Sequence, residues 1–380
     1  MSKIRPKVQT KSIIKTWPMI RLGDVCEVRA GANYKDVEDP NGLYPIYGTG
    51  GIMGRASQYR CPAHSIIVGR KGTLDNPFLV HEPFWNIDTC FGVVPSEKII
   101  PEYLFRFCQG FDFYSLVPAS GRPSTTSDAV RSIEIPLPSL SEQKEIVARL
   151  ERELAAVEKM KKGFETLAET AKVEFKAELK EVFEEISRGG AETRRLGEIG
   201  RVITGTTPSK GNKSFYGGEW PFYKPADLNQ GHNTIGAGDS LTDVGWQNAR
   251  QLPVNSVLVT CIGATLGKTG IIRREGSCNQ QINAIVCGEA ALPEYVYYSI
   301  LSPQFQSILW LSSNSTTLPM VNKSTFEKFA IPLPSLSDQR EVVSRLDADK
   351  ARVEKLEAKA REGVTVCVTM RKVILKEAFE

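Results

Sequence analysis

One segment of sixteen residues occurs twice in this chain. IPLPSLSEQKEIVARL occupies positions 135–150, IPLPSLSDQREVVSRL occupies 331–346, and twelve of the sixteen aligned positions are identical. A repeat at a fixed offset constrains the whole fold, because each copy belongs to the same kind of structural unit. The offset is about half of the 380-residue chain. We therefore predict two large units, each containing a domain and a helix, and no solenoid.

Shorter matches precede each copy in the same order. Arg-Leu-Gly followed by an acidic and an aliphatic residue stands at 21–25 and again at 195–199, and Pro-Glu-Tyr stands at 101–103 and 293–295. The predicted order is globular unit, helix, globular unit, helix. The predicted boundaries are 1–140 for the first unit with 1–16 as an extension, 141–188 for the first helix, 189–336 for the second unit and 337–380 for the second helix.

After each copy, apolar residues recur at the helical steps of three and four. We predict that Ser141 and Ser337 are the N-caps, with an acidic residue in the first turn. In the second helix, Gly363 and the β-branched residues after it predict a kink at 363–369.

The apolar positions form a heptad-like stripe that is too narrow for anything but a helical partner. We predict that the two helices pair with each other as an antiparallel coiled coil; alternatively, each packs on its own domain. The stripe that we assign to this pairing and to partner binding comprises Val147, Leu150, Leu154, Val157, Phe164, Phe175, Leu179, Val343, Leu346, Val353 and Leu356.

Composition limits the class of protein. No apolar run reaches the roughly 18 residues of a membrane span, and the lysine-rich start does not resemble a signal peptide, so we expect a soluble cytoplasmic protein without a membrane partner. The 8 cysteines form no CxxC pair, which predicts reduced core thiols and no metal site. The net charge of +4 comes from a small basic excess in the globular units, and this excess permits a localised basic surface without requiring one.

Each globular unit mixes short strand-like runs with one helical stretch, which predicts an α+β fold. The predicted strands are 65–68, 91–94, 257–260 and 281–286, and the predicted helices are 101–109 and 293–301. Framework segments match between the units, whereas the loops between them differ. Arginine, asparagine and glutamine bind base edges with two hydrogen bonds, and lysine neutralises phosphate. The candidate DNA-contacting residues are Arg70, Lys71, Asn76 and Arg122 in the first unit and Lys213, Lys224, Asn279, Gln280 and Gln281 in the second.

Catalytic patterns are missing from the sequence. Residues 262–269 resemble a phosphate-binding loop, but position 262 is isoleucine where glycine is needed and a strand is predicted after Thr269 in place of a helix. No Gly-rich turn suits S-adenosylmethionine, and no serine or cysteine has the surroundings of an activated nucleophile. We therefore predict a chain without catalytic residues. A fragment of a DNA-modifying enzyme and a structural adaptor that never contacts DNA stay open as alternatives.

The doubled IPLPSLS(E/D)Q before a long charged helix, the Arg-Leu-Gly openings and the Pro-Glu-Tyr starts resemble the specificity subunits of Type I restriction-modification systems. The resemblance covers nearly the whole chain beyond Trp17. It implies two target recognition domains, related by a pseudo-twofold axis and separated by two long antiparallel coiled-coil helices. Each domain contacts one half of a bipartite, asymmetric DNA target through the major groove.

The same resemblance implies partners in a prokaryotic cytoplasm. They are double-stranded DNA, two modification subunits that carry S-adenosylmethionine and methylate adenine, and restriction subunits that use ATP and Mg. No cofactor is implied for this chain. The helices are then expected to set the spacing between the two halves of the target, because DNA-binding domains contact half-sites about one helical turn, ~34–36 Å, apart.

Overall fold

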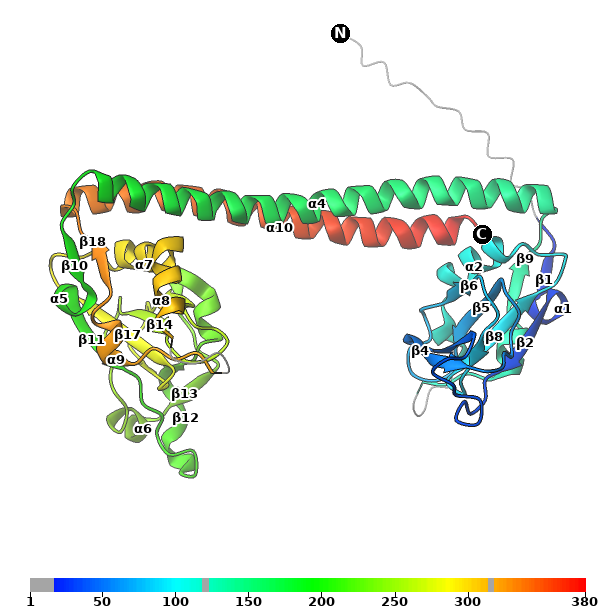
Figure 1. Cartoon of the computed structure of the whole chain (residues 1–380), viewed down its shortest axis with the longest axis horizontal. Helices are drawn as coiled ribbons and strands as arrows, with labels where there is room; N and C mark the ends of the chain where they lie inside the picture. Colours follow the sequence, from blue (N-terminus) through cyan, green and yellow to red (C-terminus); the bar gives the residue numbers. More distant parts are fainter. Residues whose placement is uncertain (1–16, 118–122, 314–317) are drawn as a thin grey trace, which may run out of the picture. The chain divides into compact units, whose positions relative to one another are not determined.

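The computed structural model describes residues 17–117, 123–313 and 318–380. The chain divides into two compact units, Met1–Phe164 with Glu362–Glu380 and Glu165–Arg361. Both units contain small sheets, short helices and a segment of each of two long helices (Figure 1). Among the helices in the described ranges, none has the length and apolarity needed to cross a membrane.

The first unit is built on a four-stranded antiparallel sheet and a three-stranded sheet. The four-stranded order is β2 (Cys26–Ala30), β8 (Cys90–Pro95), β5 (Ser65–Gly69) and β6 (Phe78–Val80). The three-stranded order is β4 (Gly51–Ala56), β3 (Tyr44–Gly48) and β7 (Trp85–Asn86), with β3 and β7 parallel. β1 (Met19–Arg21) pairs with β9 (Glu134–Pro136). The helices are α1 (Leu22–Val25), α2 (Pro101–Gly110), η1 (Phe113–Leu116) and α3 (Ser127–Arg131).

The second unit repeats this strand order in all three sheets. The four-stranded order is β11 (Gly200–Thr204), β17 (Ile282–Cys287), β14 (Val257–Thr260) and β15 (Thr269–Ile271). The three-stranded order is β13 (Asp239–Leu241), β12 (Tyr216–Tyr223) and β16 (Ser277–Cys278), and β10 (Thr193–Arg195) pairs with β18 (Ala330–Pro332). The helices are α5 (Leu196–Ile199), η2 (Lys213–Phe215), η3 (Asp227–Asn233), α6 (Asp243–Gln247), α7 (Pro293–Leu301), α8 (Pro303–Leu311) and α9 (Lys323–Phe326).

The predicted α+β fold and its duplication are confirmed. The four predicted strands correspond to β5, β8, β14 and β17, and the two predicted helices correspond to α2 and α7. The second unit also contains α8, which the prediction of one helix per unit missed. Pro303 stands in the first turn of α8, and the Ser302 hydroxyl caps it by accepting from the Phe305 amide at 3.3 Å. Serine followed by proline therefore starts a new helix here.

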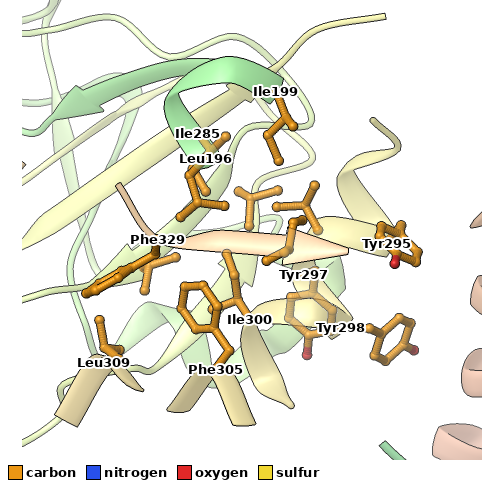
Figure 2. Packing of buried hydrophobic residues seen from close by; sticks show 14 of the residues in the cluster. Leu196, Ile199, Ile285, Tyr295, Tyr297, Tyr298, Ile300, Phe305, Leu309 and Phe329 are labelled. Atoms are coloured by element: carbon orange, nitrogen blue, oxygen red, sulfur yellow. The ribbon is translucent and has the colours of Figure 1, made fainter. Parts of the chain in front are cut away.

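The repeated motifs form the core of each unit. In the second unit, Leu196 and Ile199 of α5 belong to one buried cluster with Tyr295 and Ile300 of α7 (Figure 2). The equivalent cluster of the first unit contains Leu22, Val25, Tyr103 and Leu104. Burying each such apolar side chain stabilises the fold by about 1.5–3 kcal/mol. The Arg-Leu-Gly and Pro-Glu-Tyr motifs therefore repeat because they supply the same core contacts twice.

A buried glutamine joins each domain to the long helix that follows it. Gln143 accepts a hydrogen bond from the Ile100 amide at 2.8 Å and donates to the carbonyls of Lys98 at 3.1 Å and Pro138 at 3.0 Å. Its side chain is 0% exposed. The Tyr103 hydroxyl donates to the Pro136 carbonyl at 2.8 Å beside it. These contacts tie the start of α2 to the chain that enters α4 (Leu140–Arg188).

The second unit has the same joint. Gln339 accepts from the Leu292 amide at 2.9 Å and donates to the carbonyls of Ala290 and Pro334, both at 2.9 Å. It is also 0% exposed. The Tyr295 hydroxyl donates to the Pro332 carbonyl at 2.7 Å. The glutamine of the sixteen-residue repeat therefore has one structural role in both units.

Both long helices begin one residue earlier than predicted, and a different serine caps each of them. Ser139 accepts from the Glu142 amide at 3.4 Å, and its own amide donates to the Glu142 carboxylate at 3.0 Å, which is a capping box. Ser335 accepts from the Asp338 amide at 3.3 Å in the same way. The prediction of Ser141 and Ser337 as caps is wrong, because a capping box joins residues three apart.

The two long helices run antiparallel within the second unit. Lys172 of α4 pairs with Glu357 of α10 (Leu336–Glu377) at 3.5 Å, and Arg345 pairs with Glu178 at 2.5 Å and with Glu185 at 3.7 Å. Residue numbers rise along α4 as they fall along α10, which is the antiparallel arrangement that we predicted. In the described stripe, Val147, Leu150, Leu154, Val157, Leu179 and Leu346 are buried, and Phe164, Phe175, Val343, Val353 and Leu356 are half-buried.

The last turns of α10 belong to the first unit and repeat the contacts that α4 makes in the second. Phe379 packs edge-on against Tyr103 with ring centres 5.2 Å apart. In the second unit Phe183 packs against Tyr295 at 5.6 Å. Leu375 and Ala378 join the first core, as Leu179 and Val182 join the second. The sequence repeat therefore extends to the ends of both helices.

α10 is unbroken where we predicted a kink. It continues as one helix through 363–369. A Cβ atom at Gly363 would lie 2.6 Å from ring atoms of Phe164 in the first unit, so the glycine allows this ring to pack on the helix backbone. The glycine and the β-branched residues cost about 0.5–1 kcal/mol each in helix propensity, less than burial of a large ring contributes. The predicted interruption is wrong because packing overrides intrinsic propensity.

A polar cluster holds η3 against α10 in the second unit. The Lys350 amine lies 2.5 Å from Nδ1 of His232 and also donates to the Tyr297 hydroxyl at 3.4 Å. Burial lowers the pKa of His232, and the Lys350 charge lowers it further. Burial lowers the pKa of Lys350 as well. The lowered pKa favours the neutral form of the His232 ring in the folded chain.

Removing either joint glutamine is expected to destabilise the protein. Gln143→Ala and Gln339→Ala each leave buried backbone groups without partners, which costs about 2–3 kcal/mol in the free energy of unfolding. Urea unfolding of the full chain measures this loss. Gln247→Ala, at an exposed position at the end of α6, is the matched control and is expected to change the free energy by less than about 0.5 kcal/mol. Equal losses at all three positions would contradict the account of the joint.

The His232 cluster predicts a loss of stability in mild acid. The pKa of His232 is lower in the folded state than its unfolded value of about 6.5, so only the unfolded chain takes up this proton as the pH falls below about 6.5. Stability from this residue is therefore complete above about pH 6.5 and is lost below it. Thermal unfolding at several pH values should show a smaller acid-induced loss for His232→Gln than for the wild type. An unchanged pH dependence in the variant would refute this assignment.

Candidate nucleic-acid interface

Three loops of the first unit meet at one end of its sheets. They are the β5–β6 loop at 70–77, the β7–β8 loop at 87–89 and the segment 123–125. The Arg70 amide donates to the Thr89 carbonyl at 2.9 Å, the Thr125 amide to the Arg70 carbonyl at 2.9 Å, and the Gly72 amide to the Pro123 carbonyl at 3.2 Å. These backbone bonds hold the loops as one surface, which we call the first loop cluster.

The second unit contains the same backbone arrangement, which we call the second loop cluster. The Cys261 amide donates to the Gln281 carbonyl at 2.7 Å, the Val321 amide to the Cys261 carbonyl at 2.9 Å, and the Gly263 amide to the Pro319 carbonyl at 2.9 Å. Gly72 and Gly263 occupy the same turn, with φ of 81° and 97°. The strand registers align Gly69 with Thr260 and Cys90 with Ile282. Each unit therefore presents its loops on an equivalent backbone.

A glycine supports each cluster from below. A Cβ atom at Gly31 would lie 1.7 Å from the Ile87 carbonyl oxygen, and one at Gly205 would lie 2.1 Å from the Asn279 carbonyl oxygen. Only glycine permits this close approach of two backbone segments. Gly31 and Gly205 therefore fix the position of the β7–β8 loop and of its counterpart, 279–281.

The side chains on this shared backbone differ between the units. When the two units are aligned by strand register, Arg70 corresponds to Cys261, Lys71 to Ile262, and Asp88 to Gln280. The first cluster is charged, whereas the second is rich in amides. Two equivalent surfaces with different hydrogen-bonding groups are suited to contacting two different sets of base edges.

The structure brings Arg70 and Lys71 together around one residue, Asp88. Lys71 forms an ion pair with Asp88 at 3.3 Å, with both side chains at least half exposed. The Arg70 guanidinium lies over the Phe91 ring at 5.7 Å and donates to the Asp88 carbonyl at 3.4 Å. An exposed ion pair is worth only about 0–1 kcal/mol, so Lys71 is readily exchanged to a phosphate. Asn76 is exposed on the same loop, and Arg122 lies outside the described residues.

In the second cluster the candidate amides bind one another. The Asn279 side chain is 9% exposed and donates to the Gln281 side chain at 2.8 Å. Gln280 is exposed and accepts a hydrogen bond from the Thr207 hydroxyl. Gln280 is thus the most accessible of the three amides. Lys213 lies on η2, and Lys224 follows β12 and pairs with Asp239, so these two lysines come from separate elements.

Asp88 and Thr207 bind predicted residues in the two clusters, although neither of them is among the residues predicted from the sequence. The predicted contacts are cations and amides, whereas Asp88, the partner of Lys71, is acidic. No sequence pattern links Thr207 to Gln280, since the two lie far apart along the chain and only the fold brings them together.

Burial raises the pKa of several cysteine thiols. All 8 cysteines are free. Burial raises the pKa of Cys61 to about 11 and that of Cys90 to about 12, so both are protonated near neutral pH. His64 and His81 lie with their Nδ1 atoms 3.4 Å apart, but within the described ranges no group of three or more histidine, cysteine and acidic residues is placed to hold a metal ion.

Comparison with known proteins gives a family match and several relatives. A family model described as the Type I restriction modification DNA specificity domain matches residues 14–163 and 189–364. The chain is 36% identical over 178 residues to the Type I restriction enzyme HindI specificity subunit of Haemophilus influenzae, which covers 44% of this chain and 38% of that protein. It is 23% identical to the EcoBI specificity subunit of Escherichia coli, across 97% of this chain and 86% of that one. With the HindI subunit, therefore, the match spans less than half of the relative's length.

Two solved structures share the fold. A chain from a structure described as the basis of complex assembly and conformational transition of the type I R-M system aligns with a TM-score of 0.76 and 22% identity, covering 96% of this chain and 98% of that one. The HsdS subunit from Thermoanaerobacter tengcongensis aligns with a TM-score of 0.57 and 22% identity, over 96% and 97% of the two chains.

The geometry of Lys71 predicts the effect of removing its partner. Asp88→Asn leaves Lys71 free to bind phosphate, so affinity for DNA of any sequence is expected to rise and to fall more steeply with salt, by about one unit in the slope of log affinity against log salt concentration. Binding to a labelled duplex at several salt concentrations measures this slope.

Asp75→Asn is the matched control, because Asp75 is an exposed acidic residue of the same loop. A general effect of net charge would change the salt slope of Asp88→Asn and of Asp75→Asn equally. An unchanged slope in Asp88→Asn would contradict the assignment of Lys71 as a phosphate ligand.

Proposed function

Because the chain belongs to the family of Type I restriction-modification DNA specificity domains, we propose that it selects the DNA sequence on which a Type I restriction-modification complex acts. The observation that carries this proposal is the duplicated loop cluster. The two clusters share three backbone hydrogen bonds and a turn glycine, yet they differ in side-chain chemistry. One duplicated backbone with two sets of side chains suits a target made of two different halves.

Each loop cluster contacts one half of the target through the major groove. The first half is contacted by Arg70, Lys71, Asn76 and Arg122, and the second by Lys213, Lys224, Asn279, Gln280 and Gln281. Arginine donates two hydrogen bonds to guanine, and glutamine binds adenine through both its groups. Within these sets, the exposure of Gln280 supports it as a direct base contact, whereas the part-buried pairing of Asn279 with Gln281 supports a role in shaping the loop.

The chain supplies sequence selection, and its partners supply the chemistry. Two modification subunits carry S-adenosylmethionine and methylate adenine, and restriction subunits use ATP and Mg to act on the DNA. They dock on the paired helices, whose exposed faces carry large apolar side chains such as Met160 and Val373. The helices also set the number of base pairs between the two half-sites. The complex works in a prokaryotic cytoplasm.

Mapping methylated adenines in the host genome, with and without this chain, tests the proposal. The expected result is a set of bipartite sites that lose methylation when the chain is removed. Arg70→Ala is expected to relax one half of the target by roughly tenfold to hundredfold and to leave the other half unchanged, because one bidentate contact is worth about 1–3 kcal/mol. Gln280→Ala is expected to relax the opposite half.

Lys98→Ala serves as the control, because Lys98 is an exposed cation outside both loop clusters. It should leave both halves unchanged. Methylation that persists without the chain, or methyl transfer by the purified chain alone, would refute the proposal.

A further inference from the structure

The β3–β4 hairpin of the first unit exposes two large apolar side chains next to each other. Ile52 is 64% exposed and Met53 is 56% exposed. Consecutive residues of a regular strand point to opposite faces, so one of the two should point inward. A β-bulge explains why neither does. Ile46 pairs with Gly54 and Tyr47 pairs with Ile52, which leaves Met53 as the extra residue. Bulges redirect side chains and occur often beside functional sites.

The turn of this hairpin contains two glycines, Gly50 and Gly51, and the fold requires glycine only at position 51. Gly51 has φ of 111°, which favours glycine. Gly50 has no positive φ, and a Cβ atom there would meet nothing within 4 Å. Glycine lowers the stability of the folded chain relative to alanine because it gains more freedom on unfolding. No contact within 4 Å explains the glycine at position 50. This position therefore suits the close approach of another molecule.

The exposed pair adjoins the first loop cluster. The Ile87 amide donates to the Tyr47 carbonyl at 3.0 Å. A Cβ atom at Gly48 would lie 2.8 Å from the Met53 sulfur and 3.1 Å from the Ile87 side chain, so both side chains lie over this glycine. The residue after Ile87 is Asp88, the partner of Lys71. Met53 therefore lies beside the β7–β8 loop, so the exposed pair Ile52 and Met53, which we call the apolar tip, adjoins the first loop cluster.

The second unit has different chemistry at the same place. Tyr223 occupies the position of Tyr47, since each pairs with the second residue of a parallel two-residue strand. After Tyr223 the chain continues through Lys224 and η3 before β13, in place of a short turn. The short turn that carries Ile52 and Met53 is thus replaced in the second unit by a longer connection, in which Ile235 is 56% exposed. Such a difference between the units is expected for a group that distinguishes one half-site from the other.

We propose that Ile52 and Met53 contact the 5-methyl group of a thymine in the half-site bound by the first unit. This inference rests on the proposed function. The thymine methyl is the apolar group that the major groove presents, and aliphatic side chains recognise it by contact. The flexible thioether of Met53 adapts to the shape of that methyl group. The adjacent Arg70 and Lys71 supply phosphate and polar contacts around it.

Replacing thymine by uracil, which lacks only this methyl group, tests the inference. The full chain, assembled with its modification subunits, is bound to duplexes of the mapped target in which each thymine of either strand is replaced in turn by uracil. One position in the first half-site is expected to lose about fourfold in affinity, the value for removing one buried methyl group. The variant carrying Ile52→Ser and Met53→Ser should bind the thymine and uracil duplexes equally.

Leu43→Ser is the matched control. Leu43 is 76% exposed and precedes β3, at the end of the hairpin opposite the turn, so this variant should discriminate uracil as the wild type does. Sequence-dependent binding with no uracil-sensitive position would overturn the inference and leave the proposed function intact. So would a tip variant that fails to assemble with the modification subunits, because the tip would then be a protein contact. Absence of any sequence-dependent binding by the wild type would instead refute the proposed function, and the inference with it.

Discussion

The buried amide of one glutamine in each unit is the interaction on which the rest of the structure depends. Gln143 and Gln339 each satisfy one amide and two carbonyls at the point where a domain continues into a long helix. Leaving one such buried group unpaired costs about 1–3 kcal/mol, so each joint permits one arrangement of helix start and sheet. The sixteen-residue repeat exists because this joint is built twice.

Because the joint fixes each domain on its long helix, the residues of the loop clusters are free to vary in sequence. The backbone of each loop cluster is held by the same hydrogen bonds and by a glycine beneath it, Gly31 in one unit and Gly205 in the other. Side chains that point away from this backbone contribute little to the core. Lys71 and Ile262 can therefore occupy equivalent positions without a change of fold. A fold of this kind allows sequence preference to change while the structure and its joints stay the same.

Most of the framework could be predicted from the sequence, because its motifs occur twice and the two copies agree. The two α+β units and the antiparallel helices followed from matched motifs and from helical spacing. The errors arose where a local signal competed with packing. Ser141 looked like a cap because an acidic residue follows it, but the box forms from Ser139. Gly363 predicts a break in the helix, but the ring of Phe164 packs on this glycine and the helix continues.

The candidate interface was predicted less completely. Arg70 and Lys71 were identified by residue type, whereas Asp88 and Thr207 become visible only when the fold brings distant loops together. The exposed pair on the hairpin depends on a bulge at Met53, and strand alternation in the sequence does not reveal a bulge. Contacts between loops far apart in the chain are set by tertiary structure, so residue type alone cannot locate them.

The central claim is that each unit selects bases independently and is held by an equivalent joint. It is tested most directly by replacing residues 22–135 with residues 196–331, which exchanges the first domain for a second copy of the other between matching motifs. The methylated adenines of a host that carries this chain are then mapped. The account predicts a target whose two halves are both the sequence formerly selected by the second unit. A folded, assembled chain that keeps the original asymmetric target would contradict it.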